Sequence, residues 1–419
     1  MPLEVHEPHM NFTGSLVERP VRSIVRAVAD AAGRWLEADF PPRVRAVAAA
    51  CERTGYSIPV VEYGFDRLFS ALTGDAIEGV IRNELGSLEV LDGFVETPGR
   101  TRSRAFPVGR VCVVSSRTTI GVAIVPAIFA LCAKCDVLVK DREDALVAAF
   151  FKTLAEELDE FSASASALAW DGERERRALD EFAAVVAFGD DATLRRIRAD
   201  LPAGTRWIGY GTKASCGYVD RSALGDRSDA ARVAGGAARD LVLYDTEGCL
   251  SLHLLFVERG GSISPEEFCA MLAHATERAA VEFPPSAFDA RRTASVAAAR
   301  DAASFRASGA QGTVFSAPDA AYLIALDQPR DDPPPFLART LAVFGVDAPA
   351  DAVHYVARHG IPIEALAVAR THASNAATAR VLGASRIAPF GSLQSPPLGS
   401  YHGGRPRIAE FVHWTSDET

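Results

Sequence analysis

The sequence predicts an α/β fold with a doubly wound parallel sheet. Two short apolar runs, residues 109–114 and 136–140, flank an apolar stretch of helical character at residues 120–134. A strand, a crossover helix and a parallel strand within about 30 residues form the repeating unit of such a sheet. The pattern continues with a helix over residues 144–158 and a strand over residues 183–188. Ligands of these sheets lie beyond the carboxyl ends of the strands, so a nucleotide site is expected there.

Length and charge narrow the class of protein. A chain of 419 residues can bury a large core and is long enough for two or three domains. Hydrophobic residues make up 48% of the chain and charged residues 23%, which is typical of a soluble globular protein. The formal net charge of −10 argues against a nucleic-acid partner, because phosphate binding needs a basic surface.

No membrane segment, export signal or metal site is expected. The chain lacks an apolar run of about 18 residues, and residues 1–14 carry acids and histidines where a signal peptide would carry bases. We therefore expect a cytoplasmic protein. The seven cysteines are scattered and odd in number, which does not fit a disulfide framework, and the histidines are too widely spaced for metal ligands.

The remaining elements follow in chain order. Residues 15–85 repeat apolar positions at helical spacing and predict several amphipathic helices. Residues 90–110 change to short alternating segments broken by Gly and Pro, which is typical of strands and turns. The Ala-rich stretches at residues 265–280 and 286–303 predict two further helices.

The candidate nucleotide contacts lie at strand ends. Lys140 and Arg142 follow one predicted strand, and Gly189 follows the next and opens a helix over residues 190–199. No complete G-x-G-x-x-G accompanies them, so the pattern fits equally a βαβ unit that binds nothing.

Cys249 is the candidate nucleophile. It lies in a loop, residues 245–251, between the apolar runs 241–244 and 252–257, which predict buried strands or a helix end that leads into a strand. In such a loop a thiolate can reach a ligand, while backbone N–H groups beside Gly248 can hold an oxyanion. The alternative is a cysteine that only packs, since free Cys is among the most buried residue types.

Several stretches resemble one enzyme superfamily. Residues 130–140 look like the helix-to-strand segment of the aldehyde dehydrogenase superfamily that ends in the lysine of the cofactor-ribose site. More narrowly, four stretches resemble the LuxC-type acyl-CoA reductases, the fatty acid reductase subunits associated with bacterial luminescence. These are residues 207–215, 245–258, 389–398 and 404–412.

The resemblance implies an aldehyde-dehydrogenase-like fold in three parts. Residues 1–212 would hold N-terminal helices and a Rossmann-type nucleotide-binding domain, and residues 213–385 an α/β catalytic domain with the nucleophilic Cys. Residues 386–419 would return to the cofactor domain and serve oligomerisation. The alternating texture of residues 387–414, broken by Pro and Gly, fits an exchanged strand, so a homo-oligomer is expected.

The resemblance also implies a reaction and a cofactor. Cys249 would attack an acyl thioester, release the carrier thiol and hold the acyl group, which a nicotinamide would reduce to an aldehyde. Lys140 would bind the adenosine ribose of NADPH, and Arg142 would meet the 2′-phosphate. The other implied cofactor contacts are Ser115, Gly189 and Gly211.

Two positions depart from the superfamily pattern. Gly209 stands where the hydrolytic relatives carry a general-base Glu, so water activation would be lost unless His253 or Glu247 took that role. Arg117 stands where the relatives carry an oxyanion-binding Asn, and it could support or block the pocket. Losing such a donor costs on the order of a hundredfold in rate.

These observations predict an NADPH-dependent reductase that converts an acyl thioester to an aldehyde. The donor would be acyl-CoA or a carrier-bound acyl group, and an acyl-activating or carrier protein could be a partner. Two alternatives stay open: an NAD(P)-dependent aldehyde dehydrogenase, which Gly209 disfavours, and a non-catalytic scaffold subunit of a multi-enzyme assembly, which Arg117 favours.

Overall fold

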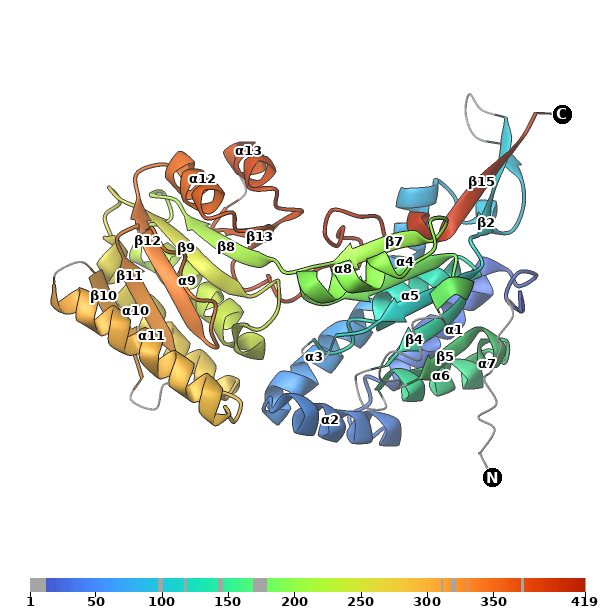
Figure 1. Cartoon of the computed structure of the whole chain (residues 1–419), viewed down its shortest axis with the longest axis horizontal. Coiled ribbons are helices and arrows are strands. Elements are labelled where there is room, and N and C mark those ends of the chain that lie inside the picture. The colour runs from blue at the N-terminus through green and yellow to red at the C-terminus, as the bar shows by residue number, and fades with distance from the viewer. Residues whose placement is uncertain are drawn as a thin grey trace.

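The computed structural model describes residues 13–96, 101–116, 119–141, 146–168, 179–309, 312–317, 322–329, 331–370 and 373–418. Across these residues the strands form three sheets, and the two large ones lie side by side with helices on both faces (Figure 1). The fold class is therefore α/β, as predicted.

Four helices open the chain, as the helical spacing predicts. They are α1 (Val21–Arg34), α2 (Pro41–Thr54), α3 (Ile58–Ala71) and α4 (Gly74–Leu85). Pro41 starts α2, Gly55 ends it with a φ of 75°, and Thr73 caps α4 by accepting from the Ala76 N–H at 3.2 Å. The buried ring of Trp35 packs between Phe65, Phe69 and Phe150 and joins these helices to the first large sheet.

The first large sheet has the predicted βαβ units and is parallel throughout. Its strands are β3 (Arg110–Val114), β4 (Asp136–Lys140), β5 (Ala165–Leu168), β6 (Ala184–Phe188) and β7 (Arg206–Tyr210), in the order β5-β4-β3-β6-β7. Its helices are α5 (Ile124–Cys132), α6 (Leu146–Glu157), α7 (Phe161–Ser164) and α8 (Asp191–Ala199). The strand order reverses between β3 and β6, and ligands of doubly wound sheets bind at such a switch point.

The second large sheet follows directly. Its strands are β8 (Ala214–Val219), β9 (Leu252–Glu258), β10 (Gly312–Ser316), β11 (Leu323–Asp327), β12 (Thr340–Val346), β13 (Ile363–Val368) and β14 (Arg386–Pro389), in the order β10-β11-β12-β9-β8-β13-β14. All neighbours are parallel except β10 and β11.

Helices cover both faces of this second sheet. One apolar cluster joins it to α9 (Arg227–Val242) and α10 (Pro265–Glu282), with α11 (Ala290–Ser308) beside β10. The other cluster joins it to α12 (Pro349–Arg358) and α13 (Ala373–Leu382). The predicted helices at residues 265–280 and 286–303 are thus confirmed as α10 and α11. Short 3-10 turns are η1 (Glu89–Leu91), η3 (Leu243–Thr246) and η4 (Ala409–Phe411).

The end of the chain returns to its first half. Strand β15 (Val412–Asp417) pairs antiparallel with β2 (Arg102–Pro107), which also pairs with β1 (Val95–Glu96). Figure 1 shows this small sheet as an arm beside the first large sheet. The division into residues 1–212, 213–385 and 386–419 stays a prediction.

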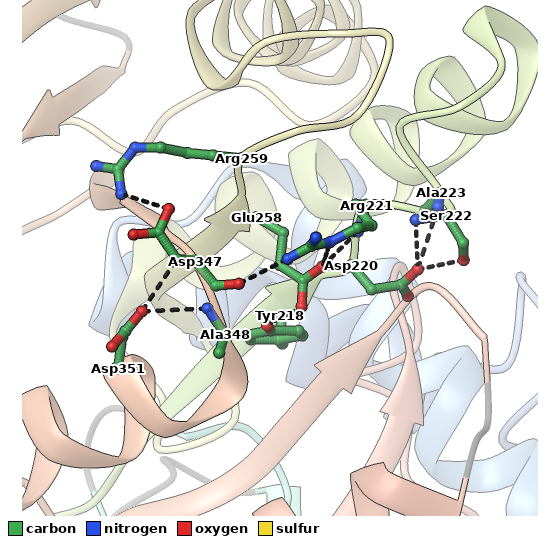
Figure 2. Close-up of polar contacts among 10 residues, drawn as sticks. All are labelled: Tyr218, Asp220, Arg221, Ser222, Ala223, Glu258, Arg259, Asp347, Ala348 and Asp351. Atoms are coloured by element: carbon green, nitrogen blue, oxygen red, sulfur yellow. Dashed lines mark hydrogen bonds and ion pairs between the residues drawn. The ribbon is translucent and has the colours of Figure 1, made fainter.

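The carboxyl edge of the second sheet is closed by charged groups (Figure 2). The buried Glu258 accepts hydrogen bonds from the Tyr218 hydroxyl and from the Arg221 N–H and Nε, the latter two at 2.9 Å. Arg259 pairs with Asp347 at 3.3 Å. These contacts tie the ends of β8, β9 and β12 together, and the candidate active site lies at the opposite, amino edge of the same strands.

Candidate active site

Cys249 lies three residues before β9, after a strained turn. The predicted run at residues 241–244 is the end of α9, and residues 252–257 form the predicted strand. Between them Tyr244, Asp245 and Thr246 have φ angles of 53°, 48° and 62°. Left-handed backbone costs a non-Gly residue roughly 1–2 kcal/mol, so surrounding contacts must hold this turn in place.

A buried ion pair provides those contacts. Arg339 Nε donates to Asp245 Oδ1 at 2.5 Å, and the Ser286 N–H donates to Asp245 Oδ2 at 3.1 Å. Arg339 is fully buried, and its Nη2 also donates to the Phe283 carbonyl at 2.7 Å. Burial lowers the pKa of Arg339, and Asp245 opposes that shift. The turn before Cys249 is therefore fixed from two other segments of the chain.

Hydrogen bonds also hold the loop on the far side of Cys249. Ser215 Oγ donates to the Cys249 carbonyl at 2.7 Å. The Gly248 N–H donates to Ser251 Oγ at 3.2 Å, and Gln394 Nε2 donates to the same oxygen at 2.7 Å. The Gly248 N–H is thus engaged within the loop, and its role in holding an oxyanion stays a prediction.

Cys249 is partly exposed as a residue although its thiol group is buried, whereas five of the other six cysteines are buried residues. Burial raises the pKa of the Cys249 thiol to about 12. The Glu364 carboxylate raises it further, and the Lys213 ammonium lowers it. In this state, with Lys213 paired to Glu364, the thiol is therefore protonated at neutral pH, and positive charge nearby favours its ionisation.

Two bulges lie beside Cys249 at the amino edge of the second sheet. The β8–β9 register passes from Ser215–Leu252 to Cys216–Leu254, so His253 is the extra residue of β9. The β13–β8 register passes from Ile363–Ala214 to Leu366–Cys216, which adds one residue to β13 where Glu364 lies. Bulges re-aim side chains and are over-represented next to active sites.

The predicted base candidate His253 is buried and neutral. Its Nδ1 lies 2.7 Å from the Ser251 carbonyl oxygen, which can only accept, so Nδ1 carries the hydrogen. Burial lowers the pKa of His253 to about 4. Its ring packs against Phe336 with centroids 4.7 Å apart. Glu247, the other base candidate, forms an ion pair with Arg292.

Lys213 and Glu364 form an ion pair that sequence reasoning missed. Lys213 Nζ lies 2.7 Å from Glu364 Oε2, and Ser385 Oγ and the Gly403 N–H donate to Oε1 at 2.6 and 2.9 Å. Burial opposes ionisation of Glu364, but these hydrogen bonds and the Lys213 charge outweigh it and lower the pKa. A Glu within the apolar run of residues 361–369 was the available signal.

The C-terminal loop closes over this pair. His402 stacks on Tyr210 with centroids 4.2 Å apart, and Tyr210 stacks on Phe188 at 4.9 Å. Burial and the Arg407 charge lower the pKa of His402 to about 4. These rings line a small cavity at the carboxyl ends of β6 and β7, together with Glu410 and Phe411.

The predicted cofactor contacts gather at the switch point of the first sheet. Ser115, Lys140 and Gly189 follow or end β3, β4 and β6, and Ser115 Oγ donates to the Lys140 carbonyl at 3.0 Å. Lys140 is partly exposed, and its role at the cofactor ribose stays a prediction. At the start of α8 the Asp190 carboxylate already accepts from the Thr193 N–H at 2.7 Å, which leaves little room there for a phosphate.

Of the remaining predicted site residues, Gly211 lies between β7 and α8. A Cβ on Gly211 would lie 2.4 Å from Asp191 Oδ1, and the Thr212 N–H donates to that oxygen at 3.0 Å. The structure thus gives Gly211 a packing role between β7 and α8. Arg117 and Arg142 lie outside the described residues, and their roles stay predictions.

Gly209 lies against the ring of a neighbouring tryptophan. A Cβ at this position would lie 2.8 Å from Cζ2 and 2.9 Å from Cε2 of Trp207. The indole of Trp207 therefore fills the space that a longer side chain at residue 209 would need.

The residues that the structure describes include neither a membrane-spanning helix nor a metal-binding cluster. Within the described ranges, no helix is long and apolar enough to cross a membrane. The same part of the chain holds no group of three or more His, Cys, Asp or Glu side chains placed to bind a metal ion.

Solved structures identify the fold. Proline utilization A from Bradyrhizobium japonicum (mutant D779W) superposes with a TM-score of 0.73 at 16% identity, covering 97% of this chain and 44% of that one. Glyceraldehyde-3-phosphate dehydrogenase GapN from Methanocaldococcus jannaschii, complexed with NADP, gives 0.69 at 10% identity, covering 96% and 91%. Aldehyde dehydrogenase 21 from Physcomitrella patens gives 0.68 at 9% identity, covering 97% and 90%.

The chain is thus an oxidoreductase with the aldehyde dehydrogenase fold. The family model for acyl-CoA reductase (LuxC) matches residues 16–414, so the chain belongs to that family. Membership implies a nicotinamide cofactor and acyl substrates. No curated protein sequence matches the chain.

Proposed function

We propose that this protein reduces an acyl thioester to an aldehyde with NADPH, through an acyl group held on Cys249. The observation that carries the proposal is the pairing of a thiol that follows a fixed turn with the space at Gly209 filled by Trp207. A site without a base at that position protects a thioester from water, as a reductase requires.

The first half of the proposed reaction needs only this chain and the acyl donor. Cys249 Sγ loses its proton and attacks the thioester carbonyl, so that one carbon–sulfur bond forms and the bond to the carrier sulfur breaks. The carrier thiolate leaves and takes up a proton. The acyl group is then bound to Cys249 as a new thioester.

The second half needs hydride, which a bound nicotinamide supplies. The Cys249 side chain holds the carbonyl carbon in place at the amino end of β9. Once the acyl carbon has received hydride, its oxygen would take up one proton; as the carbon–sulfur bond breaks, that proton would pass from the oxygen to the sulfur, so that the aldehyde leaves and Cys249 regains its thiol. Lys140 and Ser115 support the cofactor at the switch point, and Arg142 is the proposed contact of the 2′-phosphate.

The donor is proposed to be acyl-CoA or an acyl group on a carrier protein, since family members act on acyl substrates. Either donor presents its thioester on a long flexible arm that can reach a thiol set back from the surface. An acyl-activating or carrier protein is the corresponding proposed partner.

Nicotinamide oxidation tests this function directly. NADPH absorbance is followed with acyl-CoAs of increasing chain length, and aldehyde is trapped with a hydrazine in the same reactions. We expect one aldehyde for each NADPH consumed, and no product from Cys249→Ala. Aldehyde-dependent NAD(P)⁺ reduction without any thioester reduction would contradict the proposal and favour an aldehyde dehydrogenase.

A further inference from the structure

Three charged or nucleophilic residues lie at the amino ends of three neighbouring parallel strands, where Ser215 Oγ donates to the Cys249 carbonyl. Cys249 precedes β9, Lys213 precedes β8, and Glu364 follows the first residue of β13, in the sheet order β9-β8-β13. The two bulges re-aim the strands at this level. The sheet therefore gathers a thiol, an ammonium and a carboxylate from segments far apart in the chain.

The Lys213–Glu364 pair is shielded from water. The Glu364 side chain is 4% exposed and that of Lys213 is 27% exposed. Gly403, with a φ of 59°, closes over them, and a Cβ there would lie 3.1 Å from the Tyr210 ring and 3.7 Å from Lys213 Nζ. Taking two charges out of water is expensive, and hydrophobic residues of similar volume often serve stability as well. The pair thus points to a role beyond packing.

Glu364 makes more stabilising contacts than Lys213 does. Glu364 accepts from three donors on three segments, namely Lys213, Ser385 and Gly403. For Lys213 the described structure records one ion-pair partner, Glu364. The carboxylate is thus held rigidly, while the ammonium it positions keeps further N–H donors to offer.

We propose that Lys213 carries the positive charge that lets Cys249 ionise, and that Glu364 is the positioning residue that holds this ammonium beside the thiol. The proposal deepens the proposed function, because the same Cys249 would carry the acyl group. When Cys249 loses its proton, the thiolate gains the Lys213 charge as its partner, and Lys213 keeps its own proton throughout. No proton is shared between the two groups, so the effect is electrostatic.

The other charged groups near the loop are the same in every variant. Asp245 is paired with Arg339, and Glu247 is paired with Arg292. Burial keeps His253 and His402 neutral, since the pKa of each is lowered to about 4. Burial raises the pKa of Asp240 to about 7, and Asp240 is unchanged in every variant. The difference between two pH profiles of Cys249 reactivity therefore reports on the charge at residues 213 and 364.

Alkylation of Cys249 by iodoacetamide tests the proposal without acyl donor or nicotinamide. The background carries Cys51→Ser, because Cys51 is the other partly exposed cysteine. Alkylation rates are measured from pH 6 to 10 by intact mass, with Cys249→Ala as the blank.

Lys213→Met and Glu364→Gln are expected to shift the pH profile of Cys249 alkylation in opposite directions. Lys213→Met should raise the apparent thiol pKa by about one unit, which slows alkylation about tenfold at pH 8. Glu364→Gln keeps an amide oxygen that can accept from Lys213 but removes a negative charge, so it should lower the apparent pKa and speed alkylation. Lys213→Arg should stay near wild type, because it keeps the charge.

A structural role makes a different prediction. If the pair only stabilised the fold, Lys213→Met and Glu364→Gln would shift alkylation in the same direction, in parallel with their melting temperatures, and that result would overturn the proposal. An unchanged profile in Lys213→Met would overturn it as well. If Glu364→Gln does not fold, the comparison of Lys213→Met with Lys213→Arg decides alone.

The outcome is separable from that of the proposed function. A charge-dependent alkylation profile in a protein that takes up no acyl group would support the role of Lys213 and contradict thioester reduction. If the enzyme takes up an acyl group but its alkylation does not respond to Lys213→Met, the result would support thioester reduction and contradict the role of Lys213.

Discussion

At the scale of single residues, Gly209 is the position at which we predict that this chain lacks a general base. The position is a glycine because the Trp207 ring occupies the space beside it. Trp207 and Gly209 are two positions apart on β7 and so share one face of the strand, but only the structure shows that the indole lies over the glycine.

Gly209→Glu is expected to destabilise the protein and to give no aldehyde oxidation. Forcing a side chain into occupied space costs about 1–3 kcal/mol, which urea unfolding would measure. The double variant with Trp207→Ala is the control and should recover part of that loss. A stable Gly209→Glu protein that oxidises aldehydes would show that the ring moves aside without penalty.

At the scale of elements, the turn before Cys249 depends on one buried ion pair. Arg339→Met would leave the Asp245 carboxylate buried without its cation, and breaking such a pair costs about 3–5 kcal/mol. We expect this loss in urea unfolding. The matched control is Arg358→Met, since the Arg358–Asp331 pair is exposed and exposed pairs contribute about 1 kcal/mol or less. Equal losses in the two variants would show that the Asp245 pair does not hold the turn.

A second element-scale contact links α9 to the segment that carries Gln394. Asp240 accepts from the Gly391 N–H at 2.7 Å and from the Leu393 N–H at 3.0 Å. Burial raises the pKa of Asp240 to about 7, while these N–H groups and Arg386 oppose the rise. Gln394 in turn donates to Ser251 in the Cys249 loop.

This raised pKa predicts a pH effect on stability with a definite sign. The folded state binds the Asp240 proton more tightly than the unfolded chain, so its contribution is full below about pH 4 and is lost as pH rises through about 7. The difference in unfolding free energy between wild type and Asp240→Asn should therefore shrink from pH 4 to 8, by a few kcal/mol at most. A difference that is constant across this range would mean that Asp240 titrates normally.

At the scale of the whole molecule, the C-terminal arm is the expected oligomer contact. Strand β15 pairs with β2 on one side only in the described sheet, and an edge strand presents unpaired backbone groups to a partner. Its Trp414 side chain is 47% exposed. We predict that light scattering detects a homo-oligomer, which Trp414→Lys weakens by about 2 kcal/mol or more, as for other central aromatic contacts. A monomeric wild type would contradict the prediction.

The sequence predicted this fold best where a pattern is local. The apolar strands at residues 109–114, 136–140 and 183–188 and the helices after residues 265 and 286 were legible from periodicity. The short strand β5 was not predicted, because Ala165, Ser166, Ala167 and Leu168 include no β-branched or aromatic residue that favours a strand.

The site was predictable only in part. Cys249 stood out through its glycine neighbour and flanking apolar runs, and Lys140 through its strand end. Lys213 and Glu364 are 151 positions apart, and only the neighbouring amino ends of β8 and β13 bring them together. Gly211 resembled a cofactor contact in sequence, yet its backbone packs against Asp191.

The most direct test of the central claim is intact-protein mass spectrometry after mixing with a panel of acyl-CoAs in the absence of nicotinamide. We predict a mass gain of one acyl group that is absent from Cys249→Ala and is released by NADPH as aldehyde. No acyl gain with any donor, or a gain that persists in Cys249→Ala, would contradict the account.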